Sequence, residues 1–381
     1  MSSGKTRKRR GPSINKPRIK DVAKLAGVSV GTVSNVINKR ESVDPELAQR
    51  VEEAMADLHY QPNVAAQSLR RGVGNMVGVI VLDITNPFFS GVVAGIENRL
   101  SPERLLVAVS STGEDSRREQ EVLKTFATYK PRGIILTPTS SMTDHIRSLR
   151  DSGIPVLLLD SRLKNPEIPS IAVDDFQGAY LAVEHLVELE HRNILFISGP
   201  KSLRQTRDRL SGALSAIESS GHSRSSQSRQ VRLSHLEIPR FDAAEARVAV
   251  QDLLKKCGLL PFWDASTPSS ADGFAQLPAN FPTAFFCASD QIAFGAMTAL
   301  RDAGVRIPEQ VSLVGFDDIP IAAQTSIPLT TVRQDTEKLG YEAADMLLTA
   351  EEKIEHRTLM PQLVVRKSTA PPRLIRASTR S

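Results

Sequence analysis

Repeated alternation between short apolar runs and helical patterns limits the folds open to this chain more than any other feature. The first apolar run, NMVGVIVLDI at 75–84, is rich in β-branched residues and has the length of a strand buried on both faces. A helical pattern from Phe88 to about Leu100 follows. The runs RLLVAVSS, GIILTPT and PVLLLD continue the alternation, with helices expected at 117–129 and 141–152. This order predicts a parallel, doubly wound sheet.

A second series of the same kind begins near Asp174, with the apolar runs NILFISG, AFFCAS and VSLVGFD. Two such series predict two similar α/β lobes with a cleft between them. Ligands of such sheets bind beyond the carboxyl ends of the strands. The helices expected in the second series span 175–190, 207–220, 242–257 and 290–303.

Positive charge is concentrated at the N-terminal end. The chain has 381 residues and a net charge of +5, yet its first 20 residues contain eight Lys or Arg and no acid. The remainder is therefore slightly acidic. A basic arm on such a body indicates a local contact with a polyanion, although a solvated tail would give the same pattern.

Composition and pattern together divide the chain into four parts. A disordered basic arm is expected first, then a helical domain, a short capped segment and the α/β core. The predicted bounds are 1–17, 18–61, 62–74 and 75–381, with an N-lobe at about 75–173 plus 309–335 and a C-lobe at about 174–308 plus 336–372.

Several classes of protein are disfavoured by missing signals. Cys257 and Cys287 have neither CxxC spacing nor a nearby histidine cluster, so we expect no metal site and no disulfide. No apolar run approaches the roughly 18 residues of a membrane helix, and no apolar segment of a secretory leader follows the basic start. The chain also lacks GxGxxG after the first strand, GxxxxGK[ST], GxSxG and HExxH, so we predict no catalytic residues and no cofactor.

Residues 19–38, IKDVAKLAGVSVGTVSNVIN, predict two short helices joined by a tight turn at Gly27. Ser29 is a good N-cap for the second helix. A third helix is expected to begin at Asp44-Pro45, an N-cap followed by proline. The apolar face of the first helix is expected to consist of Val22, Ala23, Leu25 and Ala26.

The second helix has an outer face of small side chains, most of them polar. Val33, Val36 and Ile37 are spaced to face inward. A surface of small hydrogen-bonding groups can approach base edges and phosphates, as a helix in the DNA major groove must. The outward positions are Val30, Gly31, Thr32, Ser34, Asn35 and Asn38.

The segment PNVAAQSLRRG at 62–72 predicts a helix capped at both ends, by Asn63 and by Gly72. A helix this short is marginal in water because nucleation is costly. Leu69 is its largest apolar side chain and stands beside two arginines.

Five side chains of the core are candidates for ligand binding. Phe88 and Phe89 begin the helix after the first strand, Asp160 ends PVLLLD, Asp290 follows AFFCAS, and Arg209 begins a helix of the second lobe. Carboxylates and a guanidinium can hold several hydroxyl groups, and an aromatic face can cover the C–H face of a ring. The aspartates could instead cap helices, the phenylalanines could belong to the core, and the arginine could pair with a neighbouring acid on the surface.

Several motifs in register resemble the LacI/GalR family of bacterial transcription regulators. IKDVAKLAGVSVGTVSNVIN and RVEEAMADLHYQPNVAAQSL look like its DNA-binding headpiece and hinge. DITNPFF, VDDFQGAYLAVEHL, ASDQIAFGA, VSLVGFDD and PLTTVRQDTEKLG match its core, which is similar to periplasmic sugar-binding proteins. The resemblance covers about residues 18–370 and implies a helix-turn-helix headpiece, a hinge helix and two doubly wound lobes.

At the DNA end, the resemblance implies a set of contact residues. In the family, paired hinge helices insert a leucine into the minor groove, where such a wedge unstacks a base step. Arg18 replaces a usual threonine cap of the first helix. The positions that match family DNA contacts are Ser29, Val30, Gly31, Thr32, Ser34, Asn35 and Asn38, with Tyr60, Asn63, Ala66 and Leu69 in the hinge.

In the core, the resemblance favours effector contacts by Arg209 and Asp290 most strongly. It implies a homodimeric repressor, with a tetramer as the alternative, that binds a pseudopalindromic operator in the bacterial cytoplasm and associates with the nucleoid. SLRQTRD at 202–208 differs from the small-residue loop of many sugar-responding members, so the effector is expected to be a less usual sugar, a polyol or a nucleoside. The alternatives are a sugar-binding protein or an α/β enzyme without DNA function.

Overall fold

The computed structural model divides into two compact units, residues 1–73 and 74–381. The structure describes residues 17–61, 74–139, 143–161, 167–222, 230–259, 277–349 and 354–372. The basic arm and almost all of the expected hinge segment therefore lie outside the described residues.

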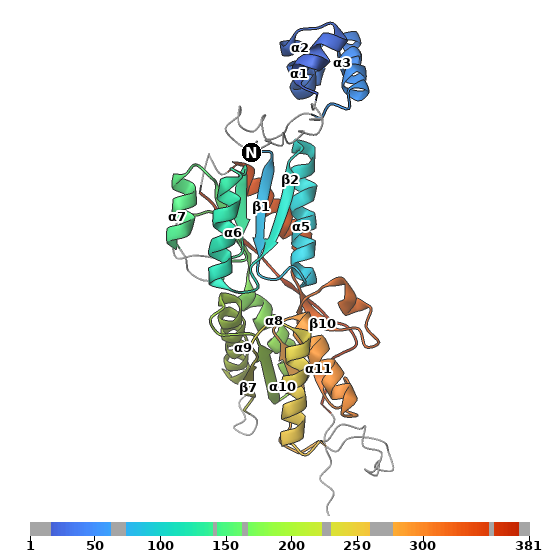
Figure 1. Cartoon of the computed structure of the whole chain (residues 1–381). Helices are drawn as coiled ribbons and strands as arrows, with labels where there is room; N and C mark the ends of the chain where they lie inside the picture. Colours follow the sequence, from blue (N-terminus) through green and yellow to red (C-terminus); the bar gives the residue numbers. More distant parts are fainter. Residues whose placement is uncertain are drawn as a thin grey trace, which may run out of the picture. The chain divides into compact units, whose positions relative to one another are not determined.

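The first unit contains three helices around a small apolar core. They are α1 (Ile19–Ala26), α2 (Val30–Lys39) and α3 (Pro45–Asp57), with a short 3-10 turn, η1 (Arg40–Ser42), between α2 and α3 (Figure 1). The core consists of Val22, Ala23, Ala26, Val33, Val36, Ala48, Val51 and Ala54. These helices match the helix-turn-helix expected from the sequence.

Local capping explains where these helices begin. The Ser29 hydroxyl accepts a hydrogen bond from the Thr32 N–H at 3.0 Å and so caps α2. At α1, where Arg18 replaces the expected threonine, the Asp21 carboxylate accepts the Arg18 N–H at 2.8 Å. The expectation for Leu25 was wrong, because its side chain is 53% exposed. Ala23 and Ala26 occupy the inward-facing positions of this part of α1, and the Leu25 side chain therefore points outward.

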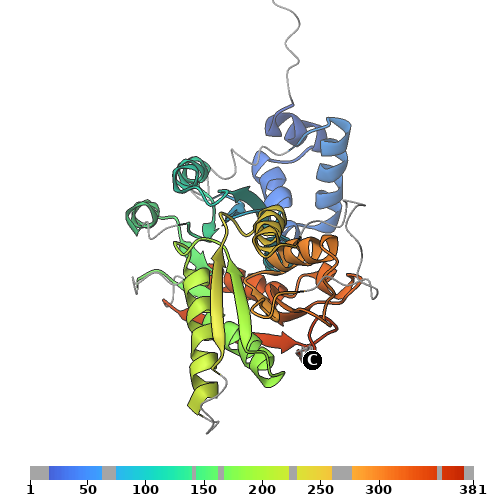
Figure 2. The same ribbon diagram turned by 90° about the horizontal axis from the view of Figure 1, so that it is seen from below.

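The second unit contains two six-stranded sheets (Figures 1 and 2). The first sheet has the order β11-β5-β4-β3-β1-β2, and all its described pairs are parallel. Its strands are β1 (Met76–Val81), β2 (Leu106–Ser111), β3 (Gly133–Leu136), β4 (Val156–Leu159), β5 (Ser170–Val173) and β11 (His356–Leu359).

The second sheet repeats this plan with the order β12-β10-β9-β8-β6-β7. It is parallel except where β12 pairs with β10. Its strands are β6 (Asn193–Ser198), β7 (Arg232–Glu237), β8 (Ala284–Cys287), β9 (Ser312–Asp317), β10 (Thr330–Arg333) and β12 (Gln362–Val364). Two doubly wound lobes confirm the fold class predicted from the alternating pattern.

Helices cover both sheets. In the first lobe α5 (Pro87–Leu100) packs against α12 (Thr336–Thr349). Glycines permit their close crossing, because a Cβ on Gly95 or on Gly340 would lie 2.0 Å from a backbone oxygen of the other helix. The remaining helices are α6 (Ser116–Thr128), α7 (Thr143–Asp151), α8 (Asp175–Glu188), α9 (Arg204–His222), α10 (Ala243–Lys256) and α11 (Asp290–Asp302).

The sheets correct the predicted division between the lobes. We expected 309–335 in the N-lobe and 336–372 in the C-lobe, but β9 and β10 lie in the second sheet and β11 lies in the first. The chain therefore passes between the sheets at 174, at 334–335 and at 360–361. Apolar runs predict strands, whereas the partner of each strand depends on tertiary packing.

Within the described segments, every helix is too short or too polar to cross a membrane.

Candidate functional site

The outer face of α2 is the first candidate site. Ser29, Gly31 and Asn35 are exposed, and Val30 is 39% exposed, although it is apolar. A Cβ built on Gly31 would meet only the Ser29 hydroxyl, at 3.4 Å, so the backbone is open to a close approach here. An exposed helix face of small side chains is suited to a close approach to base edges in the major groove.

The other predicted DNA contacts have different surroundings. Thr32 and Ser34 are half-buried, and the Thr32 hydroxyl shares a hydrogen bond with that of Ser29 at 2.9 Å. Tyr60 is half-buried against the core of the first unit. The side chain of Asn38 and the hinge residues Asn63, Ala66 and Leu69 lie outside what the structure describes.

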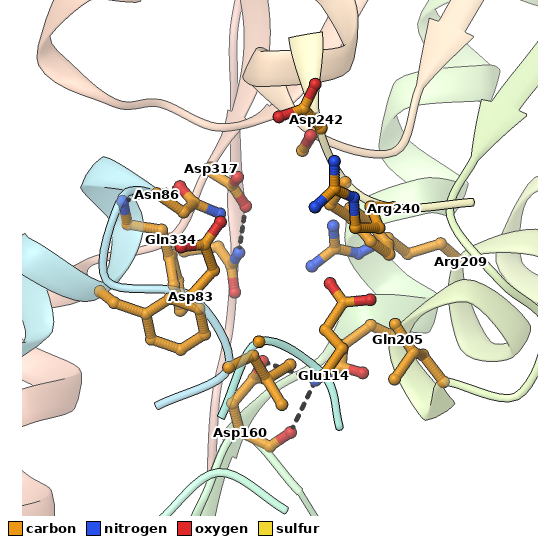
Figure 3. Close-up of a pocket in the computed structure, with 17 residues that line it drawn as sticks. Asp83, Asn86, Glu114, Asp160, Gln205, Arg209, Arg240, Asp242, Asp317 and Gln334 are labelled. Atoms are coloured by element: carbon orange, nitrogen blue, oxygen red, sulfur yellow. Dashed lines mark hydrogen bonds between the residues drawn. The ribbon is translucent and has the colours of Figure 1, made fainter. Parts of the chain in front are cut away.

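The second candidate site is a cleft between the two lobes, with a volume of about 160 Å³ (Figure 3). Its lining comes from both sheets, beyond the carboxyl ends of parallel strands, where doubly wound folds bind ligands. The first lobe contributes the turns after β1, β2 and β4 together with the start of α5. The second lobe contributes the start of α9 and the turns after β7, β8, β9 and β10.

Four of the five predicted effector residues line this cleft: Phe88, Phe89, Asp160 and Arg209. The two phenylalanine rings meet edge to face, with centroids 5.0 Å apart, and both are largely buried. They therefore belong to the core of the first lobe and also form an apolar wall of the cleft.

Asp290 differs from the other four because its carboxylate points away from the cleft. It is fully buried and accepts hydrogen bonds from the Ile319 N–H at 2.9 Å and the Thr331 hydroxyl at 2.6 Å. Burial, together with the charge of Asp317, raises its pKa well above the usual range. Its neighbour Ser289 is the residue that lines the cleft, and it also caps α11.

Arg209 is held by protein groups on several sides. Its Nε donates to Asp175 Oδ1 at 2.9 Å, its Nη1 donates to the Ala288 carbonyl, and its guanidinium lies 3.7 Å above the centroid of the Phe316 ring. Asp175 also receives Arg204 Nη2 at 3.0 Å. The guanidinium is thus fixed in direction before any ligand arrives, which favours ordered recognition.

Two buried carboxylates, Asp160 from the first lobe and Asp317 from the second, also line the cleft. Asp160 Oδ2 accepts Gln205 Nε2 at 2.8 Å, and Asp317 Oδ1 accepts Gln334 Nε2 at 2.7 Å. Burial raises the pKa of Asp160 to about 6, with a further rise from the charge of Asp175. Burial likewise raises the pKa of Asp317 to about 7, against the opposing charge of Arg209.

Most of the polar residues that line the cleft were not predicted from the sequence. Asp317 and Gln334 lie inside the motifs VSLVGFDD and PLTTVRQDTEKLG, and Glu114 follows a predicted strand, so position at a strand end was an available signal. Three lining carboxylates also have left-handed backbones, with φ of 62° at Glu114, 50° at Asp160 and 113° at Asp317. Such strain concentrates at ligand sites. The other missed polar lining residues are Asp83, Asn86, Gln205, Arg240 and Asp242.

Among the described residues, no group of His, Cys, Asp and Glu is arranged to hold a metal ion.

The sequence ranges that contain the two candidate sites match known protein families. Residues 18–63 match bacterial regulatory proteins of the lacI family. Residues 74–261 match the periplasmic binding proteins and sugar binding domain of the LacI family, and residues 183–369 match a periplasmic binding protein-like domain.

Individual relatives extend over nearly the whole chain. The ribose operon repressor of Haemophilus influenzae is 31% identical over 355 residues, which cover 92% of this chain and 98% of that protein. The crystal structure of the lac repressor dimer, bound to operator and the anti-inducer ONPF, has a TM-score of 0.76 and 28% identity and covers 93% of this chain and 100% of that one. A LacI family regulator from Enterococcus faecium with bound ribose has a TM-score of 0.64 and 28% identity and covers 78% of this chain and 99% of that one.

These matches confirm the resemblance drawn from the sequence motifs. The chain belongs to the LacI family of bacterial regulatory proteins, and it is a DNA-binding transcriptional regulator rather than an enzyme.

Proposed function

We propose that the protein is a repressor that binds a pseudopalindromic operator as a homodimer. The observation that carries this proposal is the exposed face of α2, where Ser29, Val30, Gly31 and Asn35 form a surface of small side chains. Two such helices related by a two-fold axis would read two half-sites of opposite direction. Operator binding would place the protein on the nucleoid.

A small hydroxylated effector in the cleft would control this binding. Support comes from the position of the cleft between the lobes, from its fixed guanidinium and buried carboxylates, and from the ribose bound to the Enterococcus relative. The effector can act only through different affinities for two arrangements of the lobes. Phe88, Phe89, Asp160 and Arg209 would contact it, while Asp290 would support the wall behind it.

The segment at 62–72 would couple the two sites as a hinge helix. It is too short to be stable alone, and two copies packed through Ala65 and Ala66 on bent DNA would stabilise it. Leu69 would wedge into a minor-groove step, and Asn63, Ala66 and Tyr60 would contact the DNA around it.

The decisive experiment is a gel shift with operator fragments selected by the protein from genomic DNA. We expect the wild-type chain to bind a pseudopalindrome and the Leu69→Ala variant to bind it at least about tenfold more weakly, because the kinked step loses its wedge. Leu214→Ala, which truncates an exposed leucine on α9, is the matched control and should bind like the wild type.

Failure of the wild-type chain to select any DNA would overturn the proposed function. If Leu69→Ala binds the operator as tightly as the wild type, only the proposed role of Leu69 as a minor-groove wedge is contradicted.

A further inference from the structure

We propose that the cleft takes a hydroxylated ligand bearing a protonated amino group, of the kind found in amino sugars, in preference to a neutral or phosphorylated sugar. This inference rests on the proposed function, because it names the chemical class of the effector. Three features of the cleft support it: a buried acceptor that has no donor, an excess of carboxylates in the lining, and the neighbouring acids Asp83 and Glu114.

The cleft contains a buried acceptor that has no donor. Gln334 Oε1 and Asp160 Oδ1 accept no hydrogen bond from any described residue, although the two residues are only 3% and 4% exposed. Asp160 Oδ1 has an ion pair with Arg204 Nη2 at 3.6 Å, so Gln334 Oε1 is the stronger indication of a missing donor. Gln334 is held with its amide nitrogen on Asp317, so its oxygen is the atom left for a ligand (Figure 3). A buried acceptor without a donor destabilises the empty cleft. A ligand with N–H or O–H donors would supply the missing hydrogen bond.

The residues that line the cleft include more carboxylates than cations. Arg209 lines the cleft, but its charge is matched by Asp175, whose Oδ1 lies 2.8 Å from Arg209 Nη2. Arg240 is exposed and has Glu245 at 3.6 Å. Behind the lining, Arg204 lies 3.6 Å from Asp160 Oδ1 and shares Asp175 with Arg209. The described lining contains more acids than these cations offset, namely the five carboxylates Asp83, Glu114, Asp160, Asp242 and Asp317.

This excess makes the cleft a poor site for an anion. A phosphate group would approach several carboxylates of like charge, whereas an ammonium group would be attracted by all of them, and charge-assisted hydrogen bonds are about twice as strong as neutral ones. Burial is the largest cause of the raised pKa of Asp160 and of Asp317, and neighbouring carboxylates add to the rise in both. A bound cation would therefore stabilise both carboxylates in their ionised form.

The ammonium group would lie beside Glu114 and Asp83, which both line the cleft. Burial and then the charge of Asp83 raise the pKa of Glu114, although Arg240 opposes this rise. The Asp83 carboxylate is held by Thr85, whose N–H and hydroxyl donate to it at 2.9 Å and 2.8 Å. The Glu114 carboxylate is turned toward the cleft in Figure 3. An ammonium group here would offset the repulsion between two acids that the backbone holds near each other.

The test is isothermal calorimetry on the full-length protein at about pH 7 with matched sets of ligands. Each set contains an amino sugar, its hydroxyl parent, its N-acetyl form and its 6-phosphate, for the glucose, galactose and mannose configurations. We expect an amino sugar to bind at least about tenfold more tightly than its parent and its N-acetyl form, a difference of about 1.4 kcal/mol. We expect the phosphate to be the weakest member of that set.

Two variants locate the ammonium group. Glu114→Gln and Asp83→Asn keep the shape of the side chains and remove one charge each, so each should weaken binding of the amino sugar several-fold and change binding of the neutral parent much less. Glu121→Gln, on the exposed surface of α6, is the matched control and should bind the amino sugar like the wild type. The melting temperature of each unliganded variant checks its folding.

The outcomes separate this inference from the proposed function. A parent sugar or a phosphate that binds as tightly as the amino sugar overturns the inference and leaves effector control standing. An absence of binding by all amino sugars also overturns it, and the operator gel shift on the same preparation then decides the proposed function independently. If Glu114→Gln and Asp83→Asn lose the same affinity for charged and for neutral ligands, the ammonium group does not bind beside these two acids.

Discussion

Asp290 illustrates how a residue at the predicted place can have a different role from the predicted one. It follows β8 at the edge of the sheet where the cleft lies, yet its carboxylate accepts the Ile319 N–H and the Thr331 hydroxyl. Arg209 is a contrasting case, because it both lines the cleft and is fixed by Asp175. At this scale, strand-end position predicts proximity to the cleft but leaves the direction of each side chain open.

The direction of Asp290 leads to a prediction about stability. Asp290→Ala should lower the free energy of unfolding by about 2 kcal/mol, because a buried N–H and a buried hydroxyl lose their acceptor. Urea denaturation followed by circular dichroism measures this change. Asp252→Ala, which removes an exposed carboxylate from α10, is the control and should change the stability by less than about 0.5 kcal/mol. Equal stabilities of wild type and Asp290→Ala would refute the supporting role.

At the scale of elements, most helices lie close to where local signals place them. The helix expected at 242–257 is observed at Ala243–Lys256, and that expected at 290–303 is observed at Asp290–Asp302. The α9 helix is the exception, since it begins three residues earlier than predicted, at Arg204. Its first turn is held by Arg204 and Gln205, which contact Asp160 of the other lobe. Contacts with Asp160, which is distant in the chain, thus stabilise a first turn of α9 that the local sequence pattern did not predict.

The turn between α1 and α2 supports a prediction about DNA binding. Gly27 has φ of 66°, and a Cβ there would lie 3.0 Å from Arg50 Nη2, which donates to the Ala26 carbonyl. Gly27→Ala should therefore destabilise the first unit by about 1–2 kcal/mol and weaken operator binding, because left-handed backbone is strained with a side chain. Gel shift and thermal melting measure the two effects.

Gly258→Ala is the matched control for this turn. Gly258 also has positive φ, at 77°, but lies in the second unit with open space around it. Its substitution should lower the stability of the core and leave operator affinity intact. If Gly27→Ala binds operator like the wild type, the turn does not position α2 for DNA.

At the scale of the whole molecule, two sheets bring together acids that are distant in the chain. Asp160, Asp290 and Asp317 lie at the ends of different strands. The charge of Asp317 contributes to the raised pKa of Asp290, the charge of Asp160 contributes to that of Asp317, and burial is the largest cause for all three. Family membership agrees with this arrangement, because the matched periplasmic binding protein patterns extend across both lobes. The cleft is therefore a property of the assembled core rather than of any one motif.

This cluster predicts a pH dependence of stability. Because the pKa of Asp317 is raised to about 7 in the folded state, the folded protein binds this proton more tightly than the unfolded chain does. Its contribution to the free energy of unfolding is fully present below about pH 4 and is lost as the pH rises to about 7. Asp160, with a pKa of about 6, acts in the same direction. The rise in the pKa of Asp317, by roughly three, corresponds to about 4 kcal/mol, and the rise in that of Asp160, by roughly two, corresponds to about 3 kcal/mol.

The measurement compares wild type with Asp317→Asn in urea denaturation between about pH 5 and pH 8. Asp317→Asn should lose less stability than the wild type as the pH rises, because the amide does not ionise. The comparison is needed because His191 has a pKa lowered to about 4, chiefly by burial, and acts in the opposite direction as the pH falls. Parallel curves for the two proteins would show that Asp317 does not carry a raised pKa.

The sequence by itself determined most of the helices, the seven apolar strands β1, β2, β3, β4, β6, β8 and β9, the caps of α2 and α3, and the family. These depend on the few residues around each position and on motifs that stay in register along the chain. Only the tertiary structure decided which sheet receives β9, β10 and β11, that Asp290 faces away from the cleft, and that Arg209 is held by Asp175. Each of these depends on contacts between segments far apart in the chain, and such contacts are set by how the lobes pack rather than by local pattern.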